Sequence, residues 1–193
     1  MKTGFAGLGV MGGPMARHLI APGHAVAGYN RSPAKARPWA DAHGGAFAAT
    51  VAEAAVGAEL FVLCVGNDDD VRQVVTEALP HLARGAVIVD HTTTSAKVAR
   101  EMSDLAAGQG AFFIDAPVSG GQAGAENGQL SVMAGGDAGA LSRVEPALMA
   151  YSKAVKHMGP SGAGQLTKMV NQICIAGVVQ GLAEAVHFAA RGG

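Results

Sequence analysis

The sequence predicts an α/β protein with a doubly wound, mostly parallel sheet, to which a further pair of strands is added and after which one long helix follows. Two observations lead to this prediction. Short apolar runs alternate with helix-like stretches over most of the chain, with short connections between them. Residues 163–193 then lack strand-like alternation and have the composition of a single apolar helix. We therefore expect two units, over residues 1–162 and residues 163–193.

The first element is a strand, a glycine turn and a helix start within residues 3–20 (TGFAGLGVMGGPMARHLI). Gly7, Gly9 and Gly12 have the G-x-G-x-x-G spacing. In this motif the first glycine makes a tight turn, the second lets the backbone approach a pyrophosphate, and the third lets the helix pack on the strand. The 28 glycines of the chain also produce this spacing by chance, but the strand before it and the apolar-periodic helix after it are the context that the motif requires. This region predicts a Rossmann-type dinucleotide-binding domain.

The next elements follow from apolar runs and helix caps. Ser32 with Pro33 at the first helical position, and Thr50 with Glu53 in a capping box, each start a helix. The run LFVLCV at residues 60–65 is apolar throughout, as expected of a strand buried on both faces. Further expected strands are residues 2–7, 25–29, 46–48, 86–90 and 112–116, and further expected helices are residues 71–82 and the segment from Thr94 or Ser95 to Gly108.

The stretch DAPVSGGQAGAENG at residues 115–128 is predicted to be a glycine-rich loop at the carboxyl end of a strand. The hydroxyl of Ser119 and the backbone N–H groups of Gly120 and Gly121 would form a concavity suited to a carboxylate. A flexible surface loop is the alternative. Beyond it we expect strands at residues 130–134 and 154–158 around a helix that begins at Asp137.

The end of the second strand predicts the cofactor. NAD-preferring sites place Asp or Glu there to bond the ribose 2′-hydroxyl. This chain has Asn30 and Arg31 instead, with Lys35 one helical turn further on. A guanidinium suits a 2′-phosphate, so we expect NADP to be preferred over NAD. The alternative is that Arg31 is a solvated loop residue.

The final segment, residues 162–191, is apolar on nearly every face, which is typical of a buried helix. Its polar residues include Lys168, Asn171 and Gln172, which lie at i, i+3 and i+4 and so project from one face. A lone helical lysine is usually solvated, but one among apolar residues and amides is a candidate site residue. We expect the three side chains to meet at a common point.

Composition bounds the classes of function. A net charge of −1 gives no electrostatic basis for binding nucleic acid or an anionic membrane. We find no stretch of the roughly 20 apolar residues that span a bilayer and no signal sequence before the first strand, so we expect a cytoplasmic protein that does not insert into a membrane. Cys64 and Cys174 each lie in an apolar run and are expected to be reduced core thiols.

Two other groups of polar residues have simpler explanations than a metal site. Asp68, Asp69 and Asp70 could ligate a metal, but carboxylates at a helix start are explained by capping and by the helix dipole. The seven histidines contain no H-x-x-x-H pair, so we expect no metal. His91 follows a strand beside the expected cleft and is an alternative acid–base group to Lys168.

Three motifs in order, GLGVMGGPMA, DAPVSGG followed by GAENG, and GAGQLTKMVNQ, resemble the β-hydroxyacid dehydrogenases, the family that contains 3-hydroxyisobutyrate dehydrogenase, tartronate semialdehyde reductase and the glyoxylate and succinic semialdehyde reductases. The resemblance covers the whole chain and implies Lys168 as the catalytic lysine. The residues assigned to the substrate are Ser119, Gly120, Gly121, Asn171 and Gln172. The residues assigned to the cofactor are Gly7, Leu8, Gly9, Val10, Met11, Gly12, Asn30, Arg31, Ser32, Lys35, Cys64, Val65, Gly66, Asn67 and Thr93.

The chain departs from the family pattern in a few places. Gln172 stands where many members carry a second Asn, and Thr92 and Thr93 stand where a Ser-Thr pair is common. Family members also continue into an all-helical domain that covers the active site and forms most of the dimer interface, so we expect this sequence to be a truncated product or a part of a longer chain. Because an uncovered apolar helix is unfavourable in water, we expect a homo-oligomer that associates through the terminal helix.

Together these observations predict an NADP(H)-dependent oxidoreductase that interconverts a small 3-hydroxy acid, or an ω-hydroxy acid, and its semialdehyde by hydride transfer. One alternative is a non-catalytic dinucleotide-binding or assembly module, and another is a relative that acts on imines or on phosphogluconate. Lys168 distinguishes the enzyme from the module, because only the enzyme needs it.

Overall fold

The computed structural model of the chain describes residues 1–192, and within them nine strands form one sheet. The strands are β1 (Lys2–Ala6), β2 (Ala25–Tyr29), β3 (Ala46–Phe47), β4 (Leu60–Leu63), β5 (Val87–Asp90), β6 (Phe112–Asp115), β7 (Val118–Ser119), β8 (Leu130–Gly135) and β9 (Ser152–Gly159). They lie in the order β3-β2-β1-β4-β5-β6-β8-β7, with β9 paired to β8. Strands β1 to β6 are all parallel, in the order of two mononucleotide-binding halves, which confirms the predicted doubly wound fold.

Helices cover both faces of this sheet. They are α1 (Gly12–Ile20), α2 (Pro33–His43), α3 (Val51–Ala55), α4 (Asp68–Ala78), α5 (Ala96–Gly108), α6 (Gly121–Glu126), α7 (Ala138–Leu148) and α8 (Ala163–Arg191), with one 3-10 turn, η1 (Leu79–His81). Leu60 and Val62 of β4 pack in a core with α1, α2 and α7, whereas Phe61 and Leu63 pack in a second core with α3, α4 and α5. Because all four side chains are buried, β4 is covered on both faces, as its continuous apolar sequence predicted.

The stretch at residues 115–128 differs from the loop that the sequence predicted. Val118 and Ser119 form β7, which pairs antiparallel with β8, and α6 follows directly. Gly120 makes the turn between them with a φ of 137°, a backbone conformation that favours glycine. The expected helix between two strands is confirmed as α7 between β8 and β9, and the Asp137 side chain caps α7.

The start of α4 is set by a capping asparagine. Asn67 Oδ1 accepts hydrogen bonds of 2.9 Å from the backbone N–H groups of Asp69 and Asp70. The helix therefore begins at Asp68 rather than at the predicted Val71, and the three aspartates lie in its first turn, where the helix dipole favours carboxylates.

Other caps follow the predictions in part. Thr50 accepts a hydrogen bond from Glu53 N and starts α3 as predicted, and Ser95, not Thr94, caps α5. Ser32 precedes α2 as expected, but its side chain makes no capping hydrogen bond.

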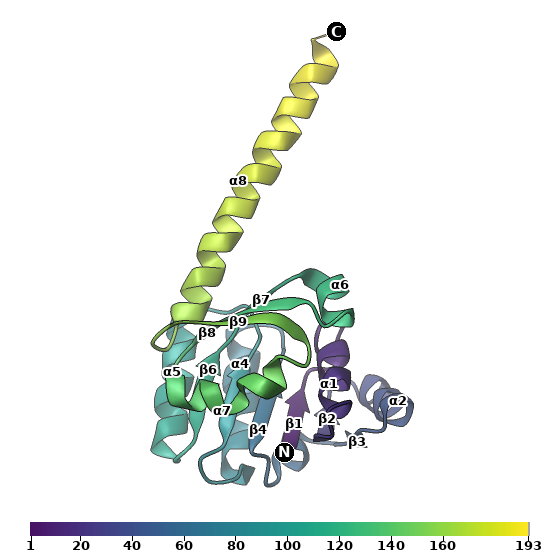
Figure 1. Cartoon of the computed structure of the whole chain (residues 1–193), viewed down its shortest axis with the longest axis vertical. Coiled ribbons are helices and arrows are strands. Elements are labelled where there is room, and N and C mark those ends of the chain that lie inside the picture. Colours follow the sequence, from purple (N-terminus) through teal and green to yellow (C-terminus); the bar gives the residue numbers. More distant parts are fainter. Residues whose placement is uncertain (193) are drawn as a thin grey trace.

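Helix α8 leaves the sheet and projects away from it (Figure 1). The prediction of a buried helix is wrong, since only Gly164 and Gln165 among its residues are buried. Ile173 and Phe188 are 71% and 79% exposed. Cys174 also lies on this helix and is exposed, so it is not the core thiol that the sequence predicted.

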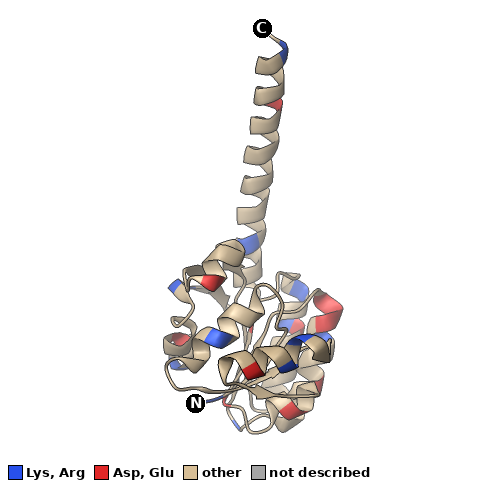
Figure 2. Cartoon of the chain, turned by 90° about the vertical axis from the view of Figure 1, so that its right-hand side faces the viewer, with Lys and Arg blue, Asp and Glu red and all other residues tan. Residues whose placement is uncertain are grey.

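The composition of α8 corrects a second prediction. Figure 2 shows few charged residues along its length, and an 18-residue window of it has a mean hydropathy of 1.6. By length and composition it could therefore cross a membrane, although no stretch of this kind was expected from the sequence. The core helix of a soluble protein passes the same test.

Candidate functional site

Two adjoining pockets lie at the carboxyl ends of the parallel strands, where open α/β sheets bind ligands. They share the segment from Cys64 to Gly66, which follows β4. The first, here the glycine pocket, is lined by Gly7, Gly9, Tyr29, Asn30, Arg31, Ser32, Lys35, Val51, Cys64, Val65, Gly66, Asp70, Gln73 and Val74. The second, here the lysine pocket, is lined by Met11, Cys64, Val65, Gly66, His91, Thr92, Thr93, Val118, Ser119, Gly120, Gly121, Lys168, Asn171 and Ile175.

The glycine turn has three different surroundings at its three glycines. Gly7 has a φ of 98°, and a Cβ there would collide with the Cys64 carbonyl. A Cβ at Gly12 would collide with the Gly7 carbonyl, because α1 starts directly against the turn. Gly9 differs from both, since a Cβ there would have no atom within 4 Å. The open side of the turn is therefore at Gly9, which lines the glycine pocket.

Asn30 and Arg31 follow β2 and differ in their contacts, since Asn30 bonds the backbone and Arg31 pairs with an acidic side chain. Asn30 Oδ1 accepts a hydrogen bond of 3.0 Å from Leu8 N, and its Nδ2 donates to Ser32 O at 3.2 Å, so Asn30 fixes the glycine turn against the β2 loop. The Arg31 side chain is 87% exposed, and its Nη1 lies 3.3 Å from Asp70 Oδ1.

The lysine pocket brings together the terminal helix and β7. Lys168 Nζ donates hydrogen bonds to Val118 O at 2.9 Å and to Ser119 Oγ at 3.3 Å. Asn171 Nδ2 lies 3.5 Å from the same hydroxyl. Burial lowers the pKa of Lys168 from its ordinary value. Of the three helix side chains expected to meet, Lys168 and Asn171 do so, and they meet at the hydroxyl of Ser119, which was predicted separately as a substrate contact.

Gln172 does not join them. It is exposed, and its Oε1 accepts a hydrogen bond of 3.4 Å from Asn171 Nδ2. Of the described residues assigned to the cofactor, four line neither pocket: Leu8, Val10, Gly12 and Asn67. Met11 and Thr93, also assigned to the cofactor, line the lysine pocket and not the glycine pocket.

A buried hydrogen-bond network, which was not predicted from the sequence, fixes the base of α8. The Asp115 carboxylate accepts hydrogen bonds from Gly162 N at 2.7 Å and from Gln165 N at 2.9 Å. The side chain of Gln165 is fully buried, accepts from Thr94 N at 3.0 Å and donates to Thr92 O at 2.7 Å. Because Lys168 is one turn further along α8, this network holds it over the pocket. A polar residue inside an apolar helix was the available signal.

His91 lines the lysine pocket but is packed as a neutral residue. Its Nδ1 lies 2.6 Å from Ala116 O, which can only accept, so Nδ1 carries the proton. Its Nε2 then accepts from the Tyr151 hydroxyl at 2.8 Å. Burial lowers the pKa of His91 to about 4. With both ring nitrogens occupied, His91 is a poorer acid–base candidate than Lys168.

Cys64 lies between the two pockets. Burial, and secondarily the Asp90 carboxyl, raises the pKa of its thiol to about 12, so the sulfur is a neutral packing group at pH 7.

The aspartates at the start of α4 each have a different partner. Asp68 accepts from Ser95, Asp69 pairs with Arg72, and Asp70 pairs with Arg31. Across residues 1–192, no three His, Cys, Asp or Glu side chains gather in a group that could hold a metal ion.

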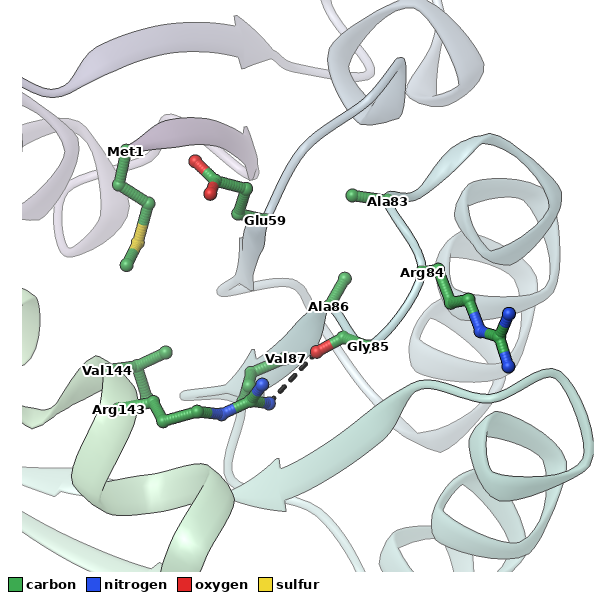
Figure 3. A pocket seen from close by; sticks show the side chains of 9 residues that line it. All are labelled: Met1, Glu59, Ala83, Arg84, Gly85, Ala86, Val87, Arg143 and Val144. Atoms are coloured by element: carbon green, nitrogen blue, oxygen red, sulfur yellow. Dashed lines mark hydrogen bonds between the residues drawn. The ribbon is translucent and has the colours of Figure 1, made fainter.

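A further pocket lies at the opposite edge of the sheet (Figure 3). It is formed at the amino ends of β4 and β5, where Arg143 donates a hydrogen bond of 2.9 Å to Gly85 O. Ligands of parallel sheets bind at the other edge, so the glycine and lysine pockets are the better candidate site.

The comparison with protein families matches residues 2–159 to the family described as the NAD binding domain of 6-phosphogluconate dehydrogenase. An uncharacterized oxidoreductase of Shewanella frigidimarina is 56% identical, and the match covers 100% of this chain and 67% of that protein. "Probable 3-hydroxyisobutyrate dehydrogenase-like 1, mitochondrial" of Arabidopsis thaliana is 40% identical over 100% of this chain and 58% of its own length. The chain thus spans from 58% to 67% of the length of these relatives.

Solved structures of oxidoreductases and related proteins match nearly the whole chain in fold. 3-Hydroxyisobutyrate dehydrogenase of Mycobacterium tuberculosis, solved with L-serine, is 36% identical and matches 95% of this chain and 63% of its own with a TM-score of 0.92. Psf3 in complex with NADP+ and 2-OPP is 29% identical over 94% of this chain and 68% of its own, with a TM-score of 0.83. An imine reductase variant from Myxococcus stipitatus in complex with NAD+ shares the fold at 22% identity, over 96% of this chain and 64% of its own, with a TM-score of 0.88.

Proposed function

The chain belongs to the 6-phosphogluconate dehydrogenase family, and its relatives include proteins named 3-hydroxyisobutyrate dehydrogenase. We propose that it is an NADP(H)-dependent oxidoreductase. It would interconvert a small 3-hydroxy acid, or an ω-hydroxy acid, and its semialdehyde. The observation that carries the proposal is the position of Lys168. Its ammonium is held by Val118 O and Ser119 Oγ in a pocket that adjoins the glycine turn.

The glycine pocket has the features that a dinucleotide needs. The open side of Gly9 leaves room for a pyrophosphate beside the backbone, and the N-terminus of α1 lies at the same turn. Arg31 and Lys35 at the other side of this pocket would take the 2′-phosphate of NADP, while no Asp or Glu ends β2. The nicotinamide of the bound cofactor would supply the hydride in one direction and accept it in the other.

In the lysine pocket, the chain itself handles the proton and the charge. When the semialdehyde is reduced, negative charge develops on its carbonyl oxygen, and the Lys168 ammonium both stabilises that charge and donates the proton. In the reverse direction the neutral amine accepts the hydroxyl proton. Because burial lowers the pKa of Lys168 from its ordinary value, the ammonium gives up its proton more readily than that of a solvated lysine, which suits this role.

The remaining residues of the lysine pocket would orient the substrate. Asn171, one turn after Lys168, shares the Ser119 hydroxyl with it and would hold the reacting hydroxyl in line. Ser119, Gly120 and Gly121 would hold the substrate carboxylate, since a hydroxyl and backbone N–H groups suit an anion. His91, which is buried and neutral, would pack beneath the substrate without exchanging a proton.

We further propose that residues 1–162 form the dinucleotide-binding domain and that α8 begins a helical unit through which copies associate. The support is the exposed apolar surface of α8, which is unfavourable in water. Light scattering tests this, since a monomer over a wide concentration range would contradict association.

The experiment that tests the proposed function is turnover across a panel of short semialdehydes with and without a carboxylate, using NADPH and NADH. We expect reduction of the carboxylate-bearing members and little reduction of the matched aldehydes that lack it. Binding of both dinucleotides without turnover of any member would favour a non-catalytic module, and turnover of cyclic imines alone would favour imine reduction.

A further inference from the structure

The carboxylate of Asp70 lines the glycine pocket together with Arg31, although the two residues come from different elements. It lies in the first turn of α4, whereas Arg31 follows β2, and both line the pocket. Asp70 Oδ1 lies 3.3 Å from Arg31 Nη1, and Asp70 Oδ2 accepts a hydrogen bond of 3.2 Å from Gly66 N. The residue that would take the 2′-phosphate therefore already faces an acid.

The two partners of this pair differ in how firmly they are held. The Arg31 side chain is 87% exposed, so the guanidinium is free to turn toward another anion, and an ion pair this exposed contributes little. The Asp70 side chain is only 23% exposed. The backbone N–H of Gly66 donates to the Asp70 carboxylate, and the backbone N–H of Asp70 donates to Asn67 Oδ1 at 2.9 Å. A phosphate can replace Asp70 on Arg31, but the carboxylate stays beside it.

We infer that Asp70 is a specificity-determining residue of the dinucleotide site, which lowers the preference for NADP that Arg31 and Lys35 create. This rests on the proposed function. Its negative charge competes for the Arg31 guanidinium and repels the 2′-phosphate. The pocket then accepts both dinucleotides.

The test is calorimetry of the Asp70→Asn variant with NADPH and NADH, and with the fragments 2′,5′-ADP and 5′-AMP, which lack the nicotinamide. Asn keeps the shape and the acceptor for Gly66 N but removes the charge. Asp69→Asn is the matched control, because it removes the same charge from the same helix turn, where Asp69 is 92% exposed and pairs with Arg72. Thermal melting of both variants checks that they are folded.

We expect Asp70→Asn to bind NADPH and 2′,5′-ADP about 3- to 10-fold more tightly, and to bind NADH and 5′-AMP within about 2-fold of the unaltered chain. Asp69→Asn should leave all four within about 2-fold. Unchanged or weaker NADPH binding by a folded Asp70→Asn variant overturns the inference alone, as does an equal gain in Asp69→Asn. If the unaltered chain binds neither dinucleotide, the proposed function fails and the inference with it.

Discussion

Gly9 and Gly12 allow the glycine turn to be tested by two changes that are chemically the same. Gly9 has no atom within 4 Å of a Cβ and no positive φ, so Gly9→Ala should fold as the parent does, with a stability change below about 1 kcal/mol. At Gly12 the same methyl group would collide with the Gly7 carbonyl and come within 3.0 Å of the Phe5 ring. Gly12→Ala should therefore lose roughly 1–3 kcal/mol of stability.

Dinucleotide affinity should fall in Gly9→Ala, the variant that keeps the stability of the parent. The methyl group of Gly9→Ala would fill the space in which the pyrophosphate approaches the backbone, so NADPH and NADH should both bind at least about tenfold more weakly, a loss of about 1.4 kcal/mol. Gly108→Ala is the matched control, because Gly108 is equally open but lies at the end of α5. Calorimetry measures affinity, and urea unfolding measures stability. A folded Gly9→Ala variant that binds either dinucleotide like the parent would refute the reasoning.

Three further predictions follow from other contacts. Arg31→Ala should weaken NADPH binding by about 1.5 kcal/mol and scarcely change NADH binding. This loss is at the low end for a charged hydrogen bond, because Asp70 shares the Arg31 guanidinium. Equal losses of affinity for the two dinucleotides by calorimetry would contradict this. Gln165→Leu should lower the free energy of unfolding, measured in urea, by roughly 2–4 kcal/mol, because it leaves Thr94 N and Thr92 O without hydrogen-bond partners. A loss under about 1 kcal/mol would show that other contacts hold α8. Burial raises the pKa of Asp90 from 3.8 to about 7, so the folded state holds this proton more tightly than the unfolded state and stability from Asp90 falls as pH rises between about 4 and 7. The Asp90→Asn variant lacks this loss, so its free energy of unfolding minus that of the parent, measured in urea at a series of pH values, should rise with pH in this window by up to about 1.4 kcal/mol per pH unit. Parallel curves for the two proteins would contradict this.

The parallel half of the fold could be predicted because its signals are local. The bounds of β2 match the prediction, and Leu60 to Leu63 carry the burial of β4 in their own sequence. The glycine turn was predictable for the same reason, since its three glycines are spaced along one short segment. Strand β7 was missed because its existence depends on pairing with Val132, which is distant in sequence from Val118.

The site could be predicted where a short motif or one helix face carries it, as in the glycine turn and the stretch from Ser119 to Gly121, which line the two pockets. Lys168 and Asn171 meet as predicted, but Gln172 lies on the exposed side, because burial of a helix face depends on which segments pack against it. Asp115 and Gln165 were not predicted, since their hydrogen bond joins residues 50 positions apart. The composition of α8 favoured a buried helix, whereas its exposure agrees with the separate expectation of an apolar helix that this chain leaves uncovered.

The most direct test of the central claim is steady-state kinetics of Lys168→Ala with the best semialdehyde of the panel, on the chain and on the chain extended by the C-terminal residues of the Shewanella relative. If the Lys168 ammonium donates the proton, kcat should fall by about 10² to 10⁴ while calorimetry shows nearly unchanged NADPH affinity, because the lysine acts in the chemical step. Lys168→Arg should not restore activity, since a guanidinium stays protonated and differs in shape. A Lys168→Ala variant that keeps most of the turnover of an active parent would contradict the account and make Lys168 a structural residue.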